Sequence, residues 1–550
     1  MPIRIIPASS LEKVFLDQRP SGTYQGGSLL ENENYSFQFA FTGYSDTAVP
    51  WGTWADADIT VESDIAEHLS LYLTGNVGVT LPTYARYDHD YLRTTPGMYP
   101  DPLTPITGGQ VKILSGRWQS IWIRTSGILP AGDHTVRLTL SSAKYACSAS
   151  AEVTLHVIPA SLPEQQLKYT CWFHADCIAD LHHCTPFSEQ HWSLMDQYMR
   201  WAGENGMNMI LVPAFTPALD TPVGSERMTI QLVGVKKRGD AYEFDFSLLD
   251  RYLSMALSHG IRWFEHAHFF TQWGAEHAPK VVAEVAEVDG QLTRIFGWET
   301  QADGPEYTSF LHQYLDALIP HLKSLGLDNQ FYYHVSDEPN DKQLDSYRRA
   351  KAIIEDRLRG YHLFDALSHV EFYEQGLVST PVAVTSSIRD FIGKADDLWA
   401  YYTGGQSFLY SNRLISMASR RNRVLGMQLY KNRIRGFLHW AFNFYYTTLS
   451  RECANPFLSP DALGEFPGGT AFQVYPHENG PVPSLRLFVF HDGLQDMRAM
   501  ALLEEKVGFD RVIEIMEKAG GRIDWENCPA GDEMFLSVRE ALNRAIEEAL

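Results

Sequence analysis

Polar and hydrophobic residues alternate along the first third of the chain, and this period of two is typical of strands with one face on a core. Six short segments have this alternation or a short apolar run, and Gly and Pro turn signals separate them. They span residues 35–41, 58–63, 69–75, 120–127, 134–140 and 151–159. Because short strands between turns are typical of a β-sandwich, we predict one over residues 1–162.

The pattern changes near residue 165, where a stretch of Pro, Ser and Gln marks a domain boundary. Beyond it, short apolar runs alternate with amphipathic helical segments. Strands are predicted at residues 167–174, 207–215, 261–270, 331–339, 362–367, 381–387, 398–403 and 436–444, and helices at residues 189–206, 246–260, 307–326, 344–358 and 493–508. These units predict a TIM-type (β/α)8 barrel over residues 165–505, with residues 506–550 as a helical extension packed on it.

Composition and charge narrow the range of partners. The 550 residues are 45% hydrophobic, enough for several cores, and 45 basic against 67 acidic residues give a formal charge of −22, which opposes binding to nucleic acid or an anionic membrane. The first residues lack a secretory signal pattern, no 18-residue apolar run occurs, and six cysteines are few for this length. We therefore expect a cytoplasmic protein without a membrane partner, and its oligomeric state stays open.

The candidate chemistry centres on the end of the fourth barrel strand. There an aromatic run breaks into two adjacent carboxylates, Asp337 and Glu338, and Pro339 follows. Proline has no N–H and favours extended geometry in the residue before it, so both carboxylates should lie where strand becomes loop. The carboxyl ends of barrel strands hold active sites. The alternative is that the two acids cap the following helix, which should begin near Leu344.

Other strand ends, together with two long insertions at residues 216–243 and 272–304, should converge on the same barrel mouth. The residues expected to bind substrate there are Trp172, His174, Asp176, Asp220, His268, Gln272, Trp273, Tyr402, Trp440 and Asn443. Together they would form a pocket with aromatic walls and a carboxylate floor. Singly, each could equally be a packed and hydrogen-bonded core residue, and Trp440 in particular could be core.

Residues 171–184 hold three Cys and three His, a composition that can indicate a metal site. The Cys spacings are wider than those of zinc motifs, and the adjacent His182 and His183 should diverge, so we expect no metal. The chain also has no P-loop, no G-x-G-x-x-G after the first barrel strand and no G-x-S-x-G turn, so we expect no cofactor.

The segment His334–Asn340, HVSDEPN, resembles part of the catalytic domain of glycoside hydrolase family 123. The likeness extends to the first strand motif WFHADC, the eighth strand motif GFLHWAFNFYY and the preceding sandwich, which is similar to that family's accessory domain. It covers the barrel from about residue 165 to residue 505. The resemblance implies retaining β-N-acetylgalactosaminidase chemistry by substrate assistance, in which Asp337 orients and charges the 2-acetamido group and Glu338 is the general acid/base.

The chemistry fits this resemblance. In other glycosidases, the two catalytic carboxylates stand about 5 Å apart when one is a nucleophile and about 6.5–9.5 Å apart when one is a base. Two residues adjacent in sequence cannot easily be placed on both sides of a glycosidic bond in this way. They can serve adjacent points of one sugar if the acetamide is the nucleophile, and mutual repulsion would raise one pKa and keep Glu338 protonated. We therefore expect an exo-acting β-N-acetylhexosaminidase with carbohydrate or glycoconjugate substrates, preferring N-acetylgalactosamine. The alternatives are a glycosidase of another sugar that pairs one acid with Glu265 or Asp176, and a carbohydrate-binding protein without activity.

Overall fold

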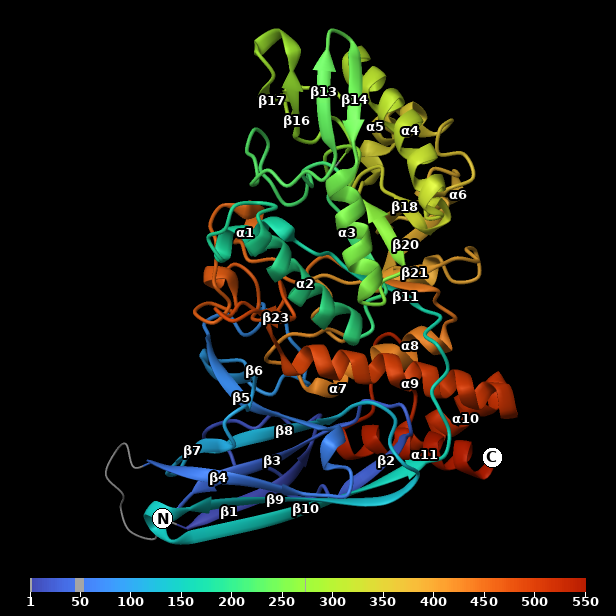
Figure 1. Ribbon diagram of the computed structural model, residues 1–550. Helices are drawn as coiled ribbons and strands as arrows, with labels where there is room; N and C mark the ends of the chain where they lie inside the picture. Colours follow the sequence, from blue (N-terminus) through green and yellow to red (C-terminus); the bar gives the residue numbers. More distant parts are fainter. Residues whose placement is uncertain (1, 45–53, 273) are drawn as a thin grey trace.

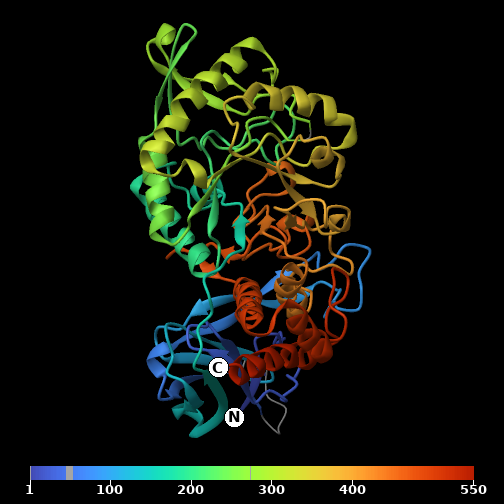
Figure 2. The same cartoon turned by 90° about the vertical axis from the view of Figure 1, so that its right-hand side faces the viewer.

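The computed structural model describes residues 2–44, 54–272 and 274–550. A sandwich-like pair of sheets forms one end of the molecule and a closed barrel forms the other (Figure 1). The long helix α9 (Leu485–Val507) runs between them, and the view turned by 90° in Figure 2 shows the same arrangement. Among the described residues, no helix has the length and apolar character needed to cross a membrane.

Two five-stranded sheets, with strand orders β1-β3-β8-β5-β6 and β2-β10-β9-β4-β7, form the sandwich-like part. Their strands are β1 (Ile3–Ser9), β2 (Gly26–Leu30), β3 (Ser36–Gly43), β4 (Trp54–Glu62), β5 (Leu69–Val79), β6 (Gly97–Pro105), β7 (Gln110–Leu114), β8 (Gln119–Thr125), β9 (Gly132–Ser142) and β10 (Cys147–Ile158). The six predicted strands are confirmed as β3, β4, β5, β8, β9 and β10. Strands β1, β2, β6 and β7 were not predicted. Strand β6 contains three prolines, which a sheet accepts there because β6 lies at the edge.

Strand β8 shows how the alternating pattern builds both the sandwich core and its junction with the rest of the chain. Ile121 and Ile123 point into the core between the two sheets. Trp122 points the other way and packs on Phe488 of α9, with ring centroids 6.4 Å apart. One face of this sheet is therefore covered by the second sheet and the other by α9.

Eight parallel strands close into a barrel in their sequence order. They are β11 (Lys168–Cys171), β12 (Met209–Val212), β15 (Trp263–His266), β18 (Phe331–Tyr333), β19 (His362–Leu367), β20 (Thr380–Val384), β21 (Trp399–Tyr401) and β22 (Gly436–His439). Pairing of β11 with β22 closes the ring. All eight predicted barrel strands are confirmed, and most pair over fewer residues than predicted because their last residues turn into the loops of the barrel mouth.

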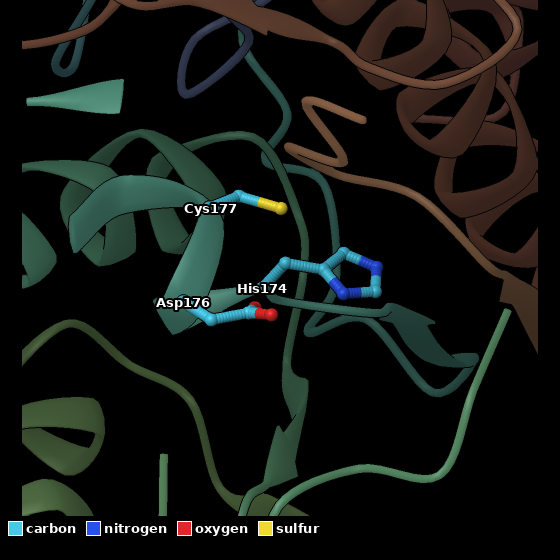
Figure 3. Close-up of side chains that lie close together, drawn as sticks. All are labelled: His174, Asp176 and Cys177. Carbon is cyan, nitrogen blue, oxygen red and sulfur yellow. The ribbon is translucent and has the colours of Figure 1, made fainter. Parts of the chain in front are cut away.

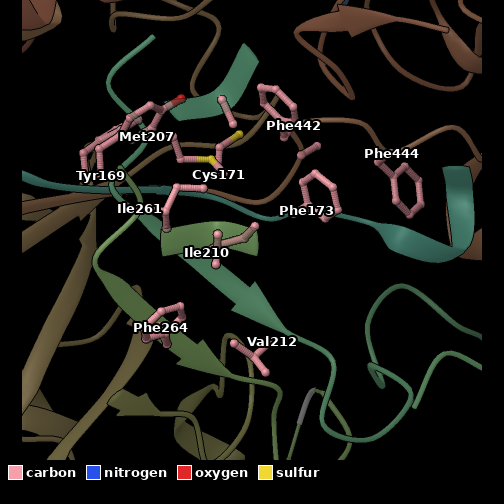
Figure 4. Close-up of a cluster of buried hydrophobic side chains, with 14 of the residues drawn as sticks. Tyr169, Cys171, Phe173, Met207, Ile210, Val212, Ile261, Phe264, Phe442 and Phe444 are labelled. Carbon is pink, nitrogen blue, oxygen red and sulfur yellow. The ribbon is translucent and has the colours of Figure 1, made fainter. Parts of the chain in front are cut away.

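Both faces of the barrel strands are buried, so their sequences are largely apolar, with Glu265 in β15 and Asp365 in β19 as buried exceptions. In β12, Met209 and Leu211 point into the barrel interior, while Ile210 and Val212 pack outward. Figure 4 shows this outer layer, in which Ile210 and Val212 lie near Phe264 of β15. The same alternation along every strand decides which side chains can reach the barrel mouth.

Helices join most of the barrel strands. They are α1 (Ala175–Leu181), α2 (Glu189–Glu204), α3 (Ser247–Ser258), α4 (Pro305–Leu325), α5 (Leu344–Ile354), α6 (Glu371–Glu374), α7 (Ser419–Arg423) and α8 (Leu425–Lys431). The predicted helices are confirmed as α2, α3, α4, α5 and α9, although α9 begins eight residues before its predicted start at residue 493. After β20, the connection holds a short 3₁₀ helix, Ile388–Asp390, where a regular strand-helix repeat would have an α-helix.

The two long insertions form a structure that the sequence did not predict. Strands β13 (Gly234–Arg238), β14 (Ala241–Asp245), β16 (Val281–Val285) and β17 (Gln291–Phe296) build a separate four-stranded sheet. It projects beyond the barrel at the top of Figure 1. Parallel pairing of β13 with β16 joins one insertion to the other, so the two insertions form one unit.

The C-terminal helices α10 (Phe509–Gly520) and α11 (Asp532–Glu548) follow α9. Helix α11 contacts the sandwich as well as α9 and α10. The Glu540 carboxylate accepts hydrogen bonds from the backbone N–H and the hydroxyl of Ser28, at 2.9 and 2.7 Å. Asn543 donates to the Ser28 carbonyl at 2.9 Å. The C-terminal segment is thereby fixed to strand β2.

A fully buried ion pair joins the sandwich to α9. Arg486 of α9 and Asp101 of β6 are 1% and 0% exposed, and the guanidinium donates to both carboxylate oxygens at 2.8 and 2.9 Å. The same guanidinium donates to the carbonyls of Gly469 and Phe472. A buried pair with this geometry is costly to break, because either partner left alone is an uncompensated buried charge.

Arg486→Met should lower the free energy of unfolding by about 3–5 kcal/mol, since Asp101 loses its ion-pair partner and two carbonyls lose a donor inside the protein. Chemical denaturation measures this loss. Arg389→Met is the matched control, because the Arg389–Glu526 pair is 54% and 33% exposed and should contribute under about 1 kcal/mol. If both substitutions lowered the unfolding free energy by the same small amount, the large contribution expected from Arg486 would be contradicted.

Candidate active site

A cavity of about 280 Å³ opens at the carboxyl ends of the barrel strands. The predicted site residues that line it are Asp337, Glu338, Trp172, His174, Asp220, Gln272 and Trp440. The other main lining residues are Tyr84, Leu219, Arg227, Tyr401, Gly404, Phe444, Phe466 and Thr470. The cavity thus joins loops from several barrel strands, both insertions and one residue of the sandwich.

Asp337 and Glu338 lie in a turn beyond β18 and are both partly exposed to the cavity. Glu338 has a φ of 42°, so the extended geometry predicted for the residue before Pro339 is wrong. Positive φ is rare outside glycine and costs about 1–3 kcal/mol, which the surrounding contacts must offset. One such contact is the Tyr401 hydroxyl, which donates to the Glu338 carboxylate at 2.6 Å.

Helix capping does not account for the two acids. The 3₁₀ helix Asp341–Gln343, which leads into α5, is capped by Asn340, whose side chain accepts from the Lys342 N–H at 3.0 Å. The Gln343 side chain completes this capping box by accepting from the Asn340 N–H. Asp337 and Glu338 therefore face the cavity while a different residue caps the helix.

Burial raises the pKa of the Asp337 carboxyl well above its ordinary range, and the neighbouring Glu338 charge raises it further. The repulsion between adjacent acids expected from the sequence is therefore present, and it raises the pKa of Asp337. The nearby His334 has the opposite influence and favours the charged carboxylate. The protonation of Asp337 therefore depends on what lies in the cavity and on the charge beneath it.

A chain of buried charges lies beneath the acidic pair. His334 is held between the Glu265 carboxylate, at 2.6 Å from Nε2, and the Asp365 carboxylate, at 2.7 Å from Nδ1. All three residues are 0% exposed. Burial alone would lower the pKa of His334, but hydrogen bonds to Asp365 and Glu265 outweigh it and raise this pKa to about 9. With both ring nitrogens donating, His334 is a buried imidazolium at neutral pH.

This chain also orients the backbone that leads to Asp337. The Asp365 carboxylate accepts from the backbone N–H groups of Val335 and Ser336, at 3.2 and 3.4 Å, and from the Tyr347 hydroxyl. On the other side, Glu265 accepts from the Thr170 hydroxyl at 2.7 Å and from the Trp172 indole N–H. The carboxylates of β15 and β19 therefore hold the segment between β18 and Asp337 in one position.

His174, Asp176 and Cys177 lie close together at the start of helix α1, after the first barrel strand (Figure 3). The Arg227 guanidinium from the first insertion donates to both Asp176 oxygens at 2.7 and 2.9 Å, and lies 3.2 Å from His174 Nδ1. Burial and the Arg227 charge lower the pKa of His174 to about 4, so this imidazole is neutral and donates from Nε2 to the Trp440 carbonyl at 2.9 Å. The positive charge beside these three residues is thus carried by Arg227.

Several predicted site residues lie outside the cavity lining. Tyr402 is 0% exposed and packs outward on Phe437 and His439, while its neighbour Tyr401 points into the barrel. The prediction for Tyr402 is therefore off by one residue, which in a strand selects the opposite face. Trp273 lies outside the described residues.

Three further predicted site residues, Asp176, Asn443 and His268, contact the residues that line the cavity. Asp176 pairs with Arg227, and Asn443 brackets the His174 backbone with hydrogen bonds of 2.9 and 3.0 Å. His268 is 2% exposed and stacks on His334, with ring centroids 4.0 Å apart. These side chains hold the groups that line the cavity and do not themselves line it.

The predicted set of substrate-binding residues omits Arg227, Tyr401, Tyr84, Phe466 and Thr470, which line the cavity. A signal existed for Tyr401, because alternation from the buried Trp399 gives Tyr401 the same inward direction. Arg227 lies in an insertion without periodicity, and Tyr84 belongs to the sandwich, far from the barrel in sequence. Nothing in the local pattern links either residue to the cavity.

Comparisons with known proteins identify the family and a shared fold. The family model described as glycoside hydrolase 123, catalytic domain, matches residues 172–503. A solved family 123 glycoside hydrolase from Clostridium perfringens, from a study of glycolipid glycan hydrolysis, superposes with a TM-score of 0.76 at 13% identity, over 99% of this chain and 98% of that chain. The arrangement of sandwich-like sheets, barrel and C-terminal helices is therefore shared with that structure.

Two β-glucuronidases are also similar, at a much lower level. The Parabacteroides merdae enzyme has a TM-score of 0.28 at 11% identity, over 80% of this chain and 47% of its own. Bacteroides uniformis β-glucuronidase 3 has a TM-score of 0.32 at 11% identity, over 89% of this chain and 51% of its own. No curated protein matches the chain.

The buried His334 should make stability depend on pH. Its pKa rises from an ordinary 6.5 to about 9 on folding, so the folded protein keeps a proton that the unfolded chain releases. This contribution to the unfolding free energy is complete below pH about 6.5 and is lost as the pH rises toward about 9, by at most about 1.4 kcal/mol per pH unit. Denaturation of wild type and His334→Gln across this window should show the extra slope in wild type alone. Parallel profiles would contradict the imidazolium assignment.

Proposed function

Because the chain belongs to glycoside hydrolase family 123, we propose that this glycoside hydrolase removes terminal β-linked N-acetylhexosamine, preferentially N-acetylgalactosamine, by substrate-assisted catalysis with retention. One observation carries the proposal: Asp337 and Glu338 open side by side on the barrel-mouth cavity. The glycolipid glycan hydrolysis described for the similar Clostridium perfringens enzyme is consistent with a terminal amino sugar as substrate.

In the proposed mechanism, Asp337 accepts a hydrogen bond from the acetamide N–H. The acetamide oxygen then attacks C1 while Glu338 donates its proton to the departing glycosidic oxygen, which leaves as an alcohol. An oxazolinium ion forms, with its positive charge beside Asp337. Glu338, now a carboxylate, removes a proton from the water that attacks C1. The bond between C1 and the acetamide oxygen breaks, the oxazolinium ring opens, and the sugar leaves with its acetamide restored.

The electrostatics of Asp337 suit a group that acts mainly in the transition state. Burial and the Glu338 charge oppose its ionisation. A cation forming next to it reverses this balance and favours the carboxylate. An interaction that strengthens as the oxazolinium forms lowers the barrier without equally tightening substrate binding.

The alternative glycosidase mechanism, with a distant second carboxylate, has less support. Glu265 is bonded to Thr170, Trp172 and His334, and Asp176 is bonded to Arg227; neither lines the cavity. Asp220 does line the cavity, so a covalent intermediate of this alternative mechanism would be expected on its carboxylate.

We also propose that the barrel is of the TIM type, (β/α)8, and that the chain divides into an accessory sandwich at residues 1–162, a catalytic barrel at 165–505 and a helical extension at 506–550. The order of the eight parallel strands supports the barrel type. The contacts of Glu540 and Asn543 with Ser28 suggest that the extension also packs on the sandwich.

Glu338→Gln removes the proton donor at nearly constant volume. Hydrolysis of substrates with sugar leaving groups should fall by at least ~100-fold, since general acid catalysis contributes about that much. Nitrophenyl glycosides need less protonation and should lose less activity. Steady-state kinetics on both classes measures the difference, and equal losses would count against Glu338 as the acid.

Asp337→Asn should lower kcat more than it raises KM, because the charge on Asp337 contributes mainly in the transition state. In wild type the pair must keep one proton for Glu338 to donate, so kcat/KM should fall as the pH rises through the raised pKa of the pair, and this limb should move in the variant, which has one titrating group fewer. A thiazoline mimic of the oxazoline should inhibit wild type far more tightly than the free sugar does.

A covalent glycosyl-enzyme would contradict the proposed mechanism. A conventional retaining glycosidase forms a covalent intermediate that a 2-fluoro sugar preserves and mass spectrometry detects. An adduct on Asp220 or any other carboxylate would overturn substrate assistance. Binding of the sugar with no turnover of any glycoside would instead favour the carbohydrate-binding alternative.

A further inference from the structure

The segment between β5 and β6 of the sandwich, residues 80–92, leaves its sheet and lies on the barrel. Tyr84 of this segment lines the barrel-mouth cavity together with Asp337 and Glu338. Within the described residues, it is the one member of the cavity lining that comes from the sandwich. The cavity wall is therefore complete only when the sandwich is in place.

Hydrogen bonds fix the first flank of this segment to the loop that follows β22. The Asp461 carboxylate accepts from the Thr80 hydroxyl at 2.7 Å and from the Leu81 N–H at 2.8 Å. The Leu81 carbonyl accepts from the Gly468 N–H at 2.9 Å. Asp461 is 0% exposed, so these bonds are shielded from water.

Buried ion pairs fix the second flank. Arg421 donates to the carboxylates of Asp88 and Asp90, at 3.1 and 3.2 Å, and Arg420 also pairs with Asp90. The Tyr91 hydroxyl donates to the Ser407 carbonyl at 2.9 Å. Tyr84 lies between two anchored flanks, so its backbone loses little further freedom when a ligand binds.

Exposure places Tyr84 at the outer end of the cavity. It is 36% exposed, whereas Trp172 at the inner end is 4% exposed. Its hydroxyl lies 3.2 Å from the position that a Cβ on Gly404 would occupy, so the absence of a side chain there makes room for the tyrosine. The ring is thus held at the cavity opening beside the loop that follows β21.

We propose that Tyr84 binds the leaving-group sugar and so selects substrates in which the terminal residue is attached to another sugar. This inference rests on the proposed exo-acting hydrolysis, in which the terminal sugar fills the enclosed end of the cavity and the leaving group points toward solvent. An aromatic ring fixed at the opening offers a flat apolar face to a pyranose, and its hydroxyl adds a polar contact. The sandwich then acts in substrate selection as well as in stability.

Two substrates separate this role from the chemistry. A β-N-acetylgalactosaminyl disaccharide has a sugar as its leaving group. β-N-acetylgalactosaminyl fluoride has the same terminal sugar, but its leaving group is a fluoride ion. Tyr84→Ala should lower kcat/KM for the disaccharide by at least about 10-fold and leave that for the fluoride within about twofold. Tyr84→Phe keeps the ring and should retain most of the disaccharide activity.

Tyr87→Ala is the matched control, because Tyr87 lies on the same segment, is 50% exposed and packs on Tyr91 rather than on the cavity. It should leave both substrates unchanged. No loss on the disaccharide, or equal losses on both substrates by a Tyr84→Ala protein that melts like wild type, would overturn the inference. A wild-type enzyme that cleaves neither substrate would overturn the proposed function itself, and the role of Tyr84 with it.

Discussion

Glu265, His334 and Asp365 form a fully buried chain of two carboxylates around one imidazolium, and the position of the catalytic candidates depends on it. Each charge would be costly alone in the barrel interior, so the three residues stay together or the region rearranges. Their side chains come from or just after β15, β18 and β19, and they therefore set how these strands are placed relative to one another. The same carboxylate of Asp365 holds the backbone that leads to Asp337.

The sandwich and the barrel depend on one another in a similar way. Helix α9 packs Phe488 on Trp122 of the sandwich and joins Asp101 through Arg486, so both apolar and ionic contacts cross the junction. The segment carrying Tyr84 crosses it a second time, directly at the cavity. Because these contacts are buried, separating the two parts would expose apolar surface and unpaired charges at once. The cavity is therefore a property of the whole chain rather than of the barrel alone.

Much of this architecture could be predicted from the sequence, and the limits have physical causes. Strands and helices with a clear period, such as β19 and α2, were predicted within a few residues. Strand β6 was missed because its prolines read as turns, and the sheet of the insertions because its strands are short and exposed. At the site, Asp337 and Glu338 could be found because they interrupt an apolar strand. Arg227 and Tyr84 could not, since only the folded chain brings them to the cavity, and Tyr402 was chosen over Tyr401 by an error of one position in the alternation.

The geometry of the acidic pair itself limits what the site can do. In an extended strand, adjacent side chains point to opposite faces, so two neighbouring acids could not both open on one cavity. The positive φ of Glu338 breaks the extended path just before Pro339 and brings its carboxylate to the same side as that of Asp337. Glycine would adopt this backbone with less strain but would provide no carboxyl group. In the proposed mechanism, two acids held this close together would serve neighbouring atoms of a single sugar whose acetamide is the nucleophile. Carboxylates that act on opposite faces of the sugar ring would have to stand farther apart.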